Sequence, residues 1–239
     1  MDIELIDPQK IKNKKILAIG AHPDDIEFGA AGTICELSKN NNITEIVVTD
    51  GGMGTHDFNA NPEQMRKVRD QETRKAAAVL GIADVFFYNY PDTELASYSK
   101  NFRKRFLKYL LKARPEIIFS VDPWGRYEPL IHPDHRILAW VVVENVLFST
   151  LPLYLKKHGF GTSTLDPKPK IWLFAPTEAN LAVDVTKTLK IKLQALKEHK
   201  SQFDNIVTFE LAEKRVKDRA QAAGKLVNVS FAELFRVLN

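Results

Sequence analysis

Four short runs of almost continuously apolar residues recur along the 239-residue chain, and they constrain its fold most strongly. The runs are residues 15–21, 44–50, 84–90 and 116–122. They are typical of strands covered on both faces. The segments between them with helical spacing and charged faces are 27–40, 62–80 and 100–114. Strand and helix therefore alternate, which predicts an α/β fold with a mostly parallel sheet and right-handed crossovers.

Turn and stop residues give the boundaries of these elements. Gly81 directly follows an apolar helix end, and Pro115 ends the next helical segment. A further helix is expected from about Pro133 to Ser149. The pattern then predicts two strands and a helix, at 171–176, 181–186 and 187–203. Residues 152–170 hold two glycines and three prolines, which is typical of a long surface excursion.

The length of the chain fits one domain with a full core. We expect a single domain over residues 1–239, with a core at about 14–203 and a C-terminal extension over 204–239. The 34 basic and 30 acidic residues are interspersed. The net charge of +4 therefore indicates solvated helix faces rather than a surface that binds nucleic acid.

Targeting and redox signals are sparse. No stretch approaches the roughly 18–20 apolar residues of a membrane helix. Residues 1–15 are charged and lack the apolar region of a signal peptide. The single cysteine, Cys35, excludes a disulfide framework and fits a reducing compartment. We therefore expect a cytoplasmic protein without a membrane span.

A chemically rich turn follows the first predicted strand, where "ILAIG" runs into His22-Pro23-Asp24-Asp25. In an open parallel sheet, ligands bind at the carboxyl ends of the strands. A helix that begins here would aim N–H groups and a positive dipole end at the same place. The alternative for any one of these residues is a simple role as helix N-cap or turn residue.

A second His-Pro-Asp segment lies more than a hundred residues further on, where His132-Pro133-Asp134-His135 follows another predicted strand and precedes a helix. Two such corners are much harder to explain as coincident caps than one. Imidazole nitrogen and carboxylate oxygen suit Zn²⁺, and three protein ligands with an open position make a catalytic site. The residues therefore predict a site of two histidines and one carboxylate, with a neighbouring aspartate that handles protons.

The pair of motifs "AHPDDIE" and "HPDH" resembles the zinc-dependent N-deacetylases of the LmbE/PIG-L family. The resemblance covers roughly residues 14–203 and includes "TDGGMGT", "NYPDTEL" and "KEHKSQF". It is strongest to the diacetylchitobiose and N-acetylglucosamine deacetylase branch. It implies a Rossmann-like three-layer fold and removal of acetate from an N-acetylglucosaminyl substrate. It also implies one Zn²⁺ per chain and a homo-oligomer, a trimer or a hexamer, without nucleic-acid or membrane partners.

The resemblance also implies residue roles. The zinc ligands it implies are His22, Asp25 and His135. It makes Asp24 the general base and His132 the group that stabilises the oxyanion.

The remaining residues are predicted to face the substrate or to support the ligands. By resemblance, Arg69 and Asp92 hold sugar hydroxyls and His199 lies at the rim of the site. Trp124 and Tyr127, beside the second corner, are candidates to stack on a sugar ring. Asp134 is expected to orient a histidine or to cap the following helix.

Several alternatives stay open at this point. Arg69 and Glu72 have the i,i+3 spacing of a surface ion pair. A non-haem iron oxygenase also uses two histidines and a carboxylate, but by family-level analogy on an antiparallel barrel. A nucleotide-binding domain would need a glycine fingerprint that "GAHPDD" lacks. A non-catalytic zinc module would need no base. The substrate could also be a thiol-precursor glucosaminide or an inositol conjugate.

Overall fold

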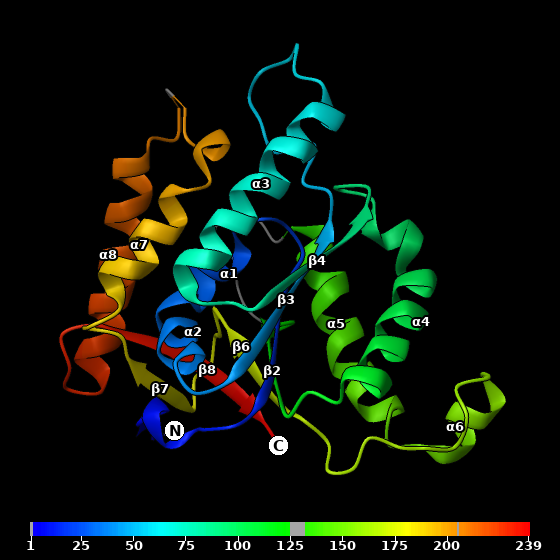
Figure 1. The fold of residues 1–239 in the computed structure, drawn as a ribbon. Helices are drawn as coiled ribbons and strands as arrows, with labels where there is room; N and C mark the ends of the chain where they lie inside the picture. Colours follow the sequence, from blue (N-terminus) through cyan, green and yellow to red (C-terminus); the bar gives the residue numbers. More distant parts are fainter. Residues whose placement is uncertain (1, 125–131, 205) are drawn as a thin grey trace.

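The computed structural model describes residues 2–124, 132–204 and 206–239. Its strands form one eight-stranded sheet in the order β1-β7-β8-β6-β5-β2-β3-β4 (Figure 1). The strands are β1 (Glu4–Ile6), β2 (Lys15–Gly20), β3 (Asn42–Thr49), β4 (Asp84–Tyr90), β5 (Ile117–Val121), β6 (Lys170–Phe174), β7 (Leu181–Asp184) and β8 (Ala232–Leu238). Only β8 pairs antiparallel with its neighbours, so the expected α/β fold with a mostly parallel sheet is confirmed.

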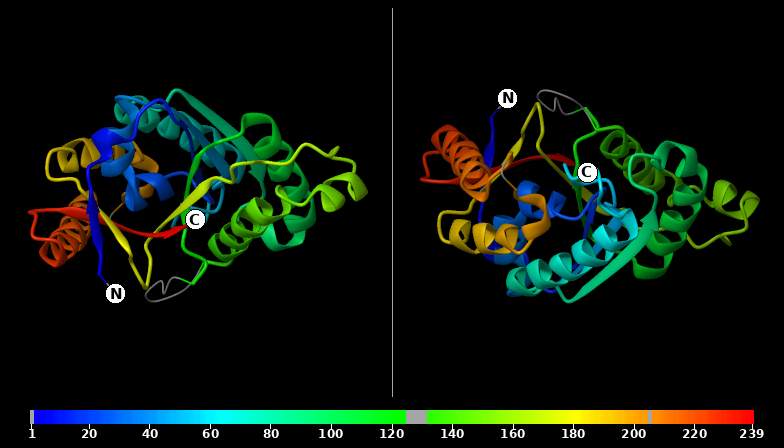
Figure 2. Two further views of the ribbon diagram at one scale, coloured as in Figure 1. Left: turned by 90° about the horizontal axis from the view of Figure 1, so that it is seen from below. Right: turned by 90° about the horizontal axis from the view of Figure 1, so that it is seen from above.

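The helices form the two outer layers. They are α1 (Asp25–Gly29), α2 (Ala31–Ser38), α3 (Pro62–Leu80), α4 (Leu95–Ala113), α5 (Pro133–Phe148), α6 (Pro152–Lys157), α7 (Leu189–Lys197) and α8 (Phe209–Leu226), with short 3₁₀ turns at Pro8–Lys10 and Lys200–Gln202. Helices α4 and α5 pack together beside one face of the sheet, while α1, α2, α3 and α7 pack together on the other (Figures 1 and 2). Within the described residues, no helix combines the length and apolar character needed to cross a membrane.

The order in which successive strands are added to the sheet changes direction at β2. From β2 the chain builds β3 and β4 to one side, whereas β5 and β6 lie on the other side. Such a switch point leaves a crevice at the carboxyl ends of the strands, because the crossovers diverge there. Both predicted His-Pro-Asp corners lie beside this crevice, one after β2 and one at the start of α5.

The single helix expected over 27–40 is two helices, α1 and α2, which break at Ala30. Two glycines explain the break. A Cβ on Gly29 would lie 2.3 Å from the Phe174 ring, and a Cβ on Gly32 would lie 2.7 Å from Val185. Side chains at the end of β6 and just after β7 therefore pack directly against the backbone at this point.

The C-terminal tail is part of the sheet and not an appended segment. The prediction treated 204–239 as an extension, but β8 inserts between β7 and β6 (Figure 1). Phe235 on β8 is fully buried, with its ring centroid 5.5 Å from those of Phe119 and Trp172. The sequence pattern of the tail does not reveal this strand, because its partners β6 and β7 lie far away in sequence.

The expected surface excursion over 152–170 contains one short helix, α6, which projects away from the sheet (Figure 1). Leu153 on this helix is 81% exposed, whereas Leu155 is buried. The prolines and glycines of the segment confine regular structure to this single turn and a half of helix.

We expect a Phe235→Ala substitution to lower the free energy of unfolding by about 3–5 kcal/mol, because it leaves a cavity between two aromatic rings. Chemical denaturation of the purified variant measures this change. Phe58→Ala serves as the matched control, since Phe58 is fully exposed and its loss should change stability by less than about 0.5 kcal/mol. Equal stability of the two variants would contradict a buried C-terminal strand.

Candidate metal centre

Three side chains from the two corners converge at the crevice. His22 Nδ1 lies 3.1 Å from His135 Nε2, and His135 Nε2 lies 3.1 Å from Asp25 Oδ1. One ligand atom from each of the three residues lies within 4.8 Å of the others. Two zinc–nitrogen bonds of about 2.0–2.1 Å at a tetrahedral angle place their nitrogens about 3.3 Å apart. The spacing and the donor types therefore fit a divalent metal ion.

Asp25 is fixed by the turn that carries it. Its Oδ2 accepts the backbone N–H groups of Ala21 at 2.7 Å and His22 at 3.0 Å, which leaves Oδ1 to face His135. Burial raises the pKa of Asp25, but His135 and His22 lower it by more, so the carboxyl stays ionised. A Cβ on Gly20 would lie 2.8 Å from Asp25 Cβ, so only glycine fits at the end of β2.

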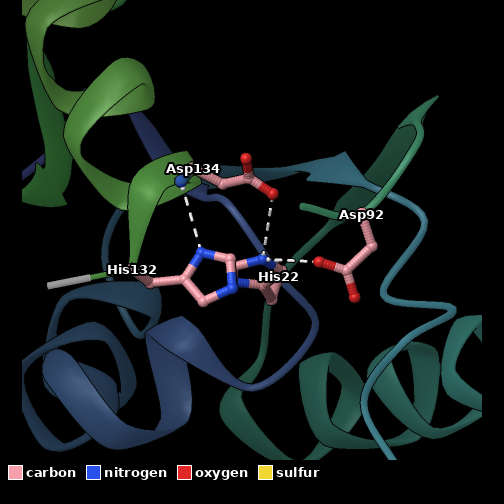
Figure 3. Close-up of side chains that lie close together, drawn as sticks. All are labelled: His22, Asp92, His132 and Asp134. Carbon is pink, nitrogen blue, oxygen red and sulfur yellow. Dashed lines mark hydrogen bonds and ion pairs between the residues drawn. The ribbon is translucent and has the colours of Figure 1, made fainter. Parts of the chain in front are cut away.

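The second nitrogen of His22 faces two carboxylates. His22 Nε2 lies 3.0 Å from Asp92 Oδ1 and 3.4 Å from Asp134 Oδ2 (Figure 3). Burial lowers the pKa of His22, but the hydrogen bonds to Asp134 and Asp92 outweigh it and raise the pKa to about 10. The metal-free ring is therefore protonated, and the two carboxylates hold one proton on Nε2. A metal ion would then replace the proton on Nδ1, the nitrogen that faces His135.

Asp134 does more than the sequence predicted. Besides facing His22, its carboxylate accepts the N–H groups of Thr93 at 2.8 Å and Leu95 at 3.1 Å. The expected role in orienting a histidine agrees with this geometry. The helix start that Asp134 satisfies is that of α4, not that of its own helix α5. The same side chain thus joins two helices to the metal centre.

Asp92 and Arg69 are both buried, 5% and 3% exposed. Besides facing His22, Asp92 accepts the N–H of Met53 at 3.1 Å. Arg69 donates to the carbonyls of Pro23 at 2.6 Å and Gly51 at 2.9 Å. Their predicted contacts with sugar hydroxyls stay a prediction, since both side chains are occupied here by the protein itself.

The alternative of a surface ion pair between Arg69 and Glu72 is wrong. Glu72 instead accepts the N–H and the hydroxyl of Ser201, at 2.9 and 2.6 Å. Both residues are buried on the inner face of α3, where their i,i+3 spacing directs them to different partners. The spacing alone could not distinguish these cases.

Asp24 precedes the ligand Asp25, but its side chain lies against Arg69 and not in the group of three ligands. Its backbone adopts a left-handed conformation with a φ of 91°, which is unusual for a residue with a side chain. Its Oδ2 lies 3.4 Å from the Arg69 guanidinium, and its side chain is 15% exposed. Burial raises the pKa of Asp24, and the opposing effects of Arg69 and His199 do not reverse this. The carboxyl is therefore more basic than an ordinary aspartate.

His132 stands beside the ligand cluster without belonging to its inner three. Its Nδ1 accepts the N–H of Asp134 at 3.2 Å (Figure 3), so the ring carries its proton on Nε2 when neutral. Its ring centroid lies 4.3 Å from that of His22 and 5.4 Å from that of His135. Burial lowers the pKa of His132, and the two neighbouring imidazoles lower it further. This favours a neutral hydrogen-bond donor.

His199 is not at the rim of the site, which corrects the prediction. It is fully buried, and its Nε2 lies 3.3 Å from Glu27 Oε2, also fully buried. Burial lowers the pKa of His199, but Glu27 and Asp24 raise it by more. Glu27 is the residue that the sequence analysis missed. The sequence feature that could have indicated its role is its place two positions after Asp25, on the same short helix α1.

Trp124 lies outside the ligand cluster. It is 41% exposed, and its ring packs edge-on against Trp140 with centroids 5.0 Å apart. The Arg236 guanidinium covers the Trp124 ring at 4.8 Å. Its predicted stacking on a sugar stays a prediction, and Tyr127 lies outside the described residues.

Comparisons with known proteins identify the family to which the chain belongs. The family model described as "PIG-L: GlcNAc-PI de-N-acetylase" matches residues 17–146. The chain is 33% identical over 226 residues to a diacetylchitobiose deacetylase of Thermococcus kodakarensis, covering 93% of this chain and 82% of that protein. It is also 32% identical to an uncharacterised deacetylase, YaiS, of Escherichia coli, over 80% of this chain and 92% of that one.

A solved structure of N,N'-diacetylchitobiose deacetylase from Pyrococcus horikoshii superposes with a TM-score of 0.86 and 35% identity. The match covers 94% of this chain and 84% of that one. A 4-carboxy-2-hydroxymuconate hydratase from Pseudomonas putida shares the fold at a TM-score of 0.74 but only 18% identity. The fold alone therefore does not determine the chemistry, which depends on the side chains at the crevice.

We expect His135→Ala to weaken the affinity for a divalent metal by at least about 100-fold, because one of three protein ligands is lost. Competition with a chromophoric chelator measures the affinity. His158→Ala is the control, since that ring packs on Tyr154 and not at the crevice. Unchanged affinity of the His135 variant would contradict the proposed ligand set.

Proposed function

The chain belongs to the PIG-L family of de-N-acetylases, and from this membership and the geometry we propose that it hydrolyses the N-acetyl amide of an N-acetylglucosaminyl substrate. The products are acetate and a free amine. The substrate type is that of the similar deacetylases, diacetylchitobiose or N-acetylglucosamine. One observation carries the proposal: the ligand atoms of two histidines and a carboxylate converge within 4.8 Å, and an aspartate and a third histidine lie beside this group of three.

The metal in this proposal is Zn²⁺, held by His22, Asp25 and His135. Two imidazoles and one carboxylate are ligands that suit zinc, and three protein ligands leave a position for water or substrate. When bound, zinc supplies Lewis-acid polarisation of the amide carbonyl and lowers the pKa of a bound water toward about 7.

Asp24 is the general base in this mechanism. Asp24 directly precedes the ligand Asp25 but is not part of the group of three ligands, and Arg69 holds one of its oxygens at 3.4 Å. Because burial raises its pKa, it accepts the proton of the attacking water more readily than an ordinary aspartate would. It then delivers that proton to the nitrogen of the departing amine.

His132 stabilises the negative charge that develops on the carbonyl oxygen. Since Nδ1 accepts the N–H of Asp134, the neutral ring presents Nε2–H as a donor. A preorganised donor of this kind typically contributes about 10²–10³-fold to the rate. Asp134 thereby serves both histidines, because its carboxylate faces His22 and its backbone fixes His132.

We propose that Trp124 contacts the substrate directly, whereas Arg69, Asp92 and His199 are buried and act through other residues of the protein. Trp124 is exposed and so can meet a sugar ring directly. Each of the three buried residues contacts another part of the site. Arg69 donates to the turn that carries Asp24, Asp92 pairs with His22, and His199 pairs with Glu27. Trimeric or hexameric assembly and a cytoplasmic location stay predictions.

The rival functions receive less support. An iron oxygenase was expected on an antiparallel barrel, whereas the observed sheet is open and mostly parallel. A non-catalytic zinc module gives no reason for a strained aspartate beside the ligands. Deacetylases of other N-acetylglucosaminyl conjugates share this site chemistry and are separated only by assay.

We expect Asp24→Asn to keep its zinc but to lose turnover by at least about 10²-fold, because the amide cannot take the proton from water. Metal content by mass spectrometry and acetate release from diacetylchitobiose measure the two effects separately. Asp204→Asn, which alters an exposed carboxylate next to His56, is the control. Deacetylation at the normal rate by the zinc-loaded Asp24 variant would contradict the base assignment.

We expect acetate release to stop when the enzyme is treated with a chelator and to return with Zn²⁺. The screen should include diacetylchitobiose, N-acetylglucosamine, an inositol conjugate and a malate conjugate of N-acetylglucosamine. Release from the first two, and weaker release from the conjugates, is the expected result. Chelator-resistant activity would overturn the metal-dependent mechanism.

A further inference from the structure

A buried ion pair lies at the break between α1 and α2, at the opposite end of α1 from the ligand Asp25. Lys192 of α7 and Glu233 of β8 approach to 2.6 Å, and their side chains are 4% and 5% exposed. Neither residue belongs to the metal centre, and nothing in the proposed chemistry uses them. Burying two charges is costly unless further hydrogen bonds satisfy both of them.

Those further hydrogen bonds go to the two helix ends at the break. Lys192 Nζ donates to the carbonyl of Phe28 at 3.0 Å, in the last turn of α1. Glu233 Oε1 accepts the N–H of Gly32 at 3.0 Å and Oε2 accepts that of Thr33 at 2.8 Å, in the first turn of α2. A cation thus meets the negative end of one helix, and an anion meets the positive end of the next.

Helix α1 needs such support because it is very short. It has five residues, and no side chain caps its N-terminus. A helix of this length has no stability of its own, so its position depends on the contacts around it. Its first residue is Asp25, and Asp24 precedes it directly. Any shift of α1 therefore moves the ligand and the base together.

The residues that hold the break between α1 and α2 come from the last part of the chain. Besides Lys192, Thr188 at the start of α7 donates its hydroxyl to the carbonyl of Gly32 at 2.9 Å. Glu233 lies on β8, which is in the interior of the sheet. The break between the helices is thus anchored to two elements of the C-terminal half.

We infer that Lys192 and Glu233 are positioning residues for the metal centre. Lys192 holds the end of α1, and Glu233 holds both Lys192 and the start of α2, so that together they set the places of Asp25 and Asp24. The inference rests on the proposed function, since it takes Asp25 as a metal ligand. The two charged side chains bond the backbone groups at the two helix ends, and this is possible in only one arrangement of the break. Apolar residues in their place would leave those carbonyl and N–H groups without hydrogen-bond partners.

The test uses Glu233→Gln and the double variant Lys192→Met/Glu233→Gln in the full chain. The double variant leaves no unpaired charge in the interior, so it is the one expected to fold like the wild type. Zinc affinity is measured by chelator competition on folded protein, and the visible spectrum of the Co²⁺-substituted protein reports the ligand geometry. We expect zinc affinity to fall about tenfold, as for other changes outside the ligand set, and the Co²⁺ spectrum to change.

A control must lose stability without losing these helix-end contacts. Val216→Ala fits this need, since Val216 is 5% exposed and belongs to the apolar cluster between α7 and α8. This variant should show a lower melting temperature but wild-type zinc affinity and a wild-type Co²⁺ spectrum. Glu116→Gln adds a second control, because its ion pair with Lys14 lies before the start of β2, far from the ligands.

The inference is overturned if both charge variants keep the zinc affinity and Co²⁺ spectrum of the wild type, or lose no more of either than Val216→Ala does. A failure of the proposed function would look different. The wild-type chain itself would then bind no zinc or release no acetate, before any variant is compared.

Discussion

The orientation of one imidazole, that of His22, underlies the whole site. Its Nε2 is held by Asp92 and Asp134, so its Nδ1 is directed toward His135 and the metal position. Each carboxylate is in turn fixed by backbone N–H groups from other elements. A ligand ring held in this way is preorganised, because its angle and the nitrogen that keeps its proton are both set before a metal binds. The site therefore depends on β2, the end of β4 and the start of α5 being held in one arrangement.

Buried charge is used repeatedly around this centre, and each time it meets a helix end or a turn. Asp134 satisfies the start of α4, Arg69 satisfies the turn that carries Asp24, and the Lys192–Glu233 pair satisfies the break between α1 and α2. Such groups are poor sources of stability because of their desolvation cost. They are effective at selecting one geometry, since displacing them leaves a buried polar group without a partner. This explains why so many charged residues surround a site whose chemistry needs only five.

Much of the fold could be predicted from the chain, because hydrophobic period and helix stops are local. The strands β2, β4 and β5 and the helix α3, ended by Gly81, lie where the pattern placed them. The two His-Pro-Asp corners were also predicted to meet, because parallel strands share one carboxyl edge. The break at Ala30 was not predicted, because it depends on the packing of Phe174 against Gly29 and of Val185 against Gly32. The C-terminal strand was not placed either, because its partners β6 and β7 precede it by dozens of residues.

The sequence by itself determined the alternation of strands and helices, the position of both corners at strand ends, and the donor types available for a metal. These properties follow from residue type and spacing, which do not depend on the rest of the fold. Only the tertiary structure decided which partner each buried polar group takes: Glu72 turns to Ser201 rather than to Arg69, and His199 is buried against Glu27 rather than open to solvent. Charged side chains have many possible partners along a sequence, and close packing selects one for each.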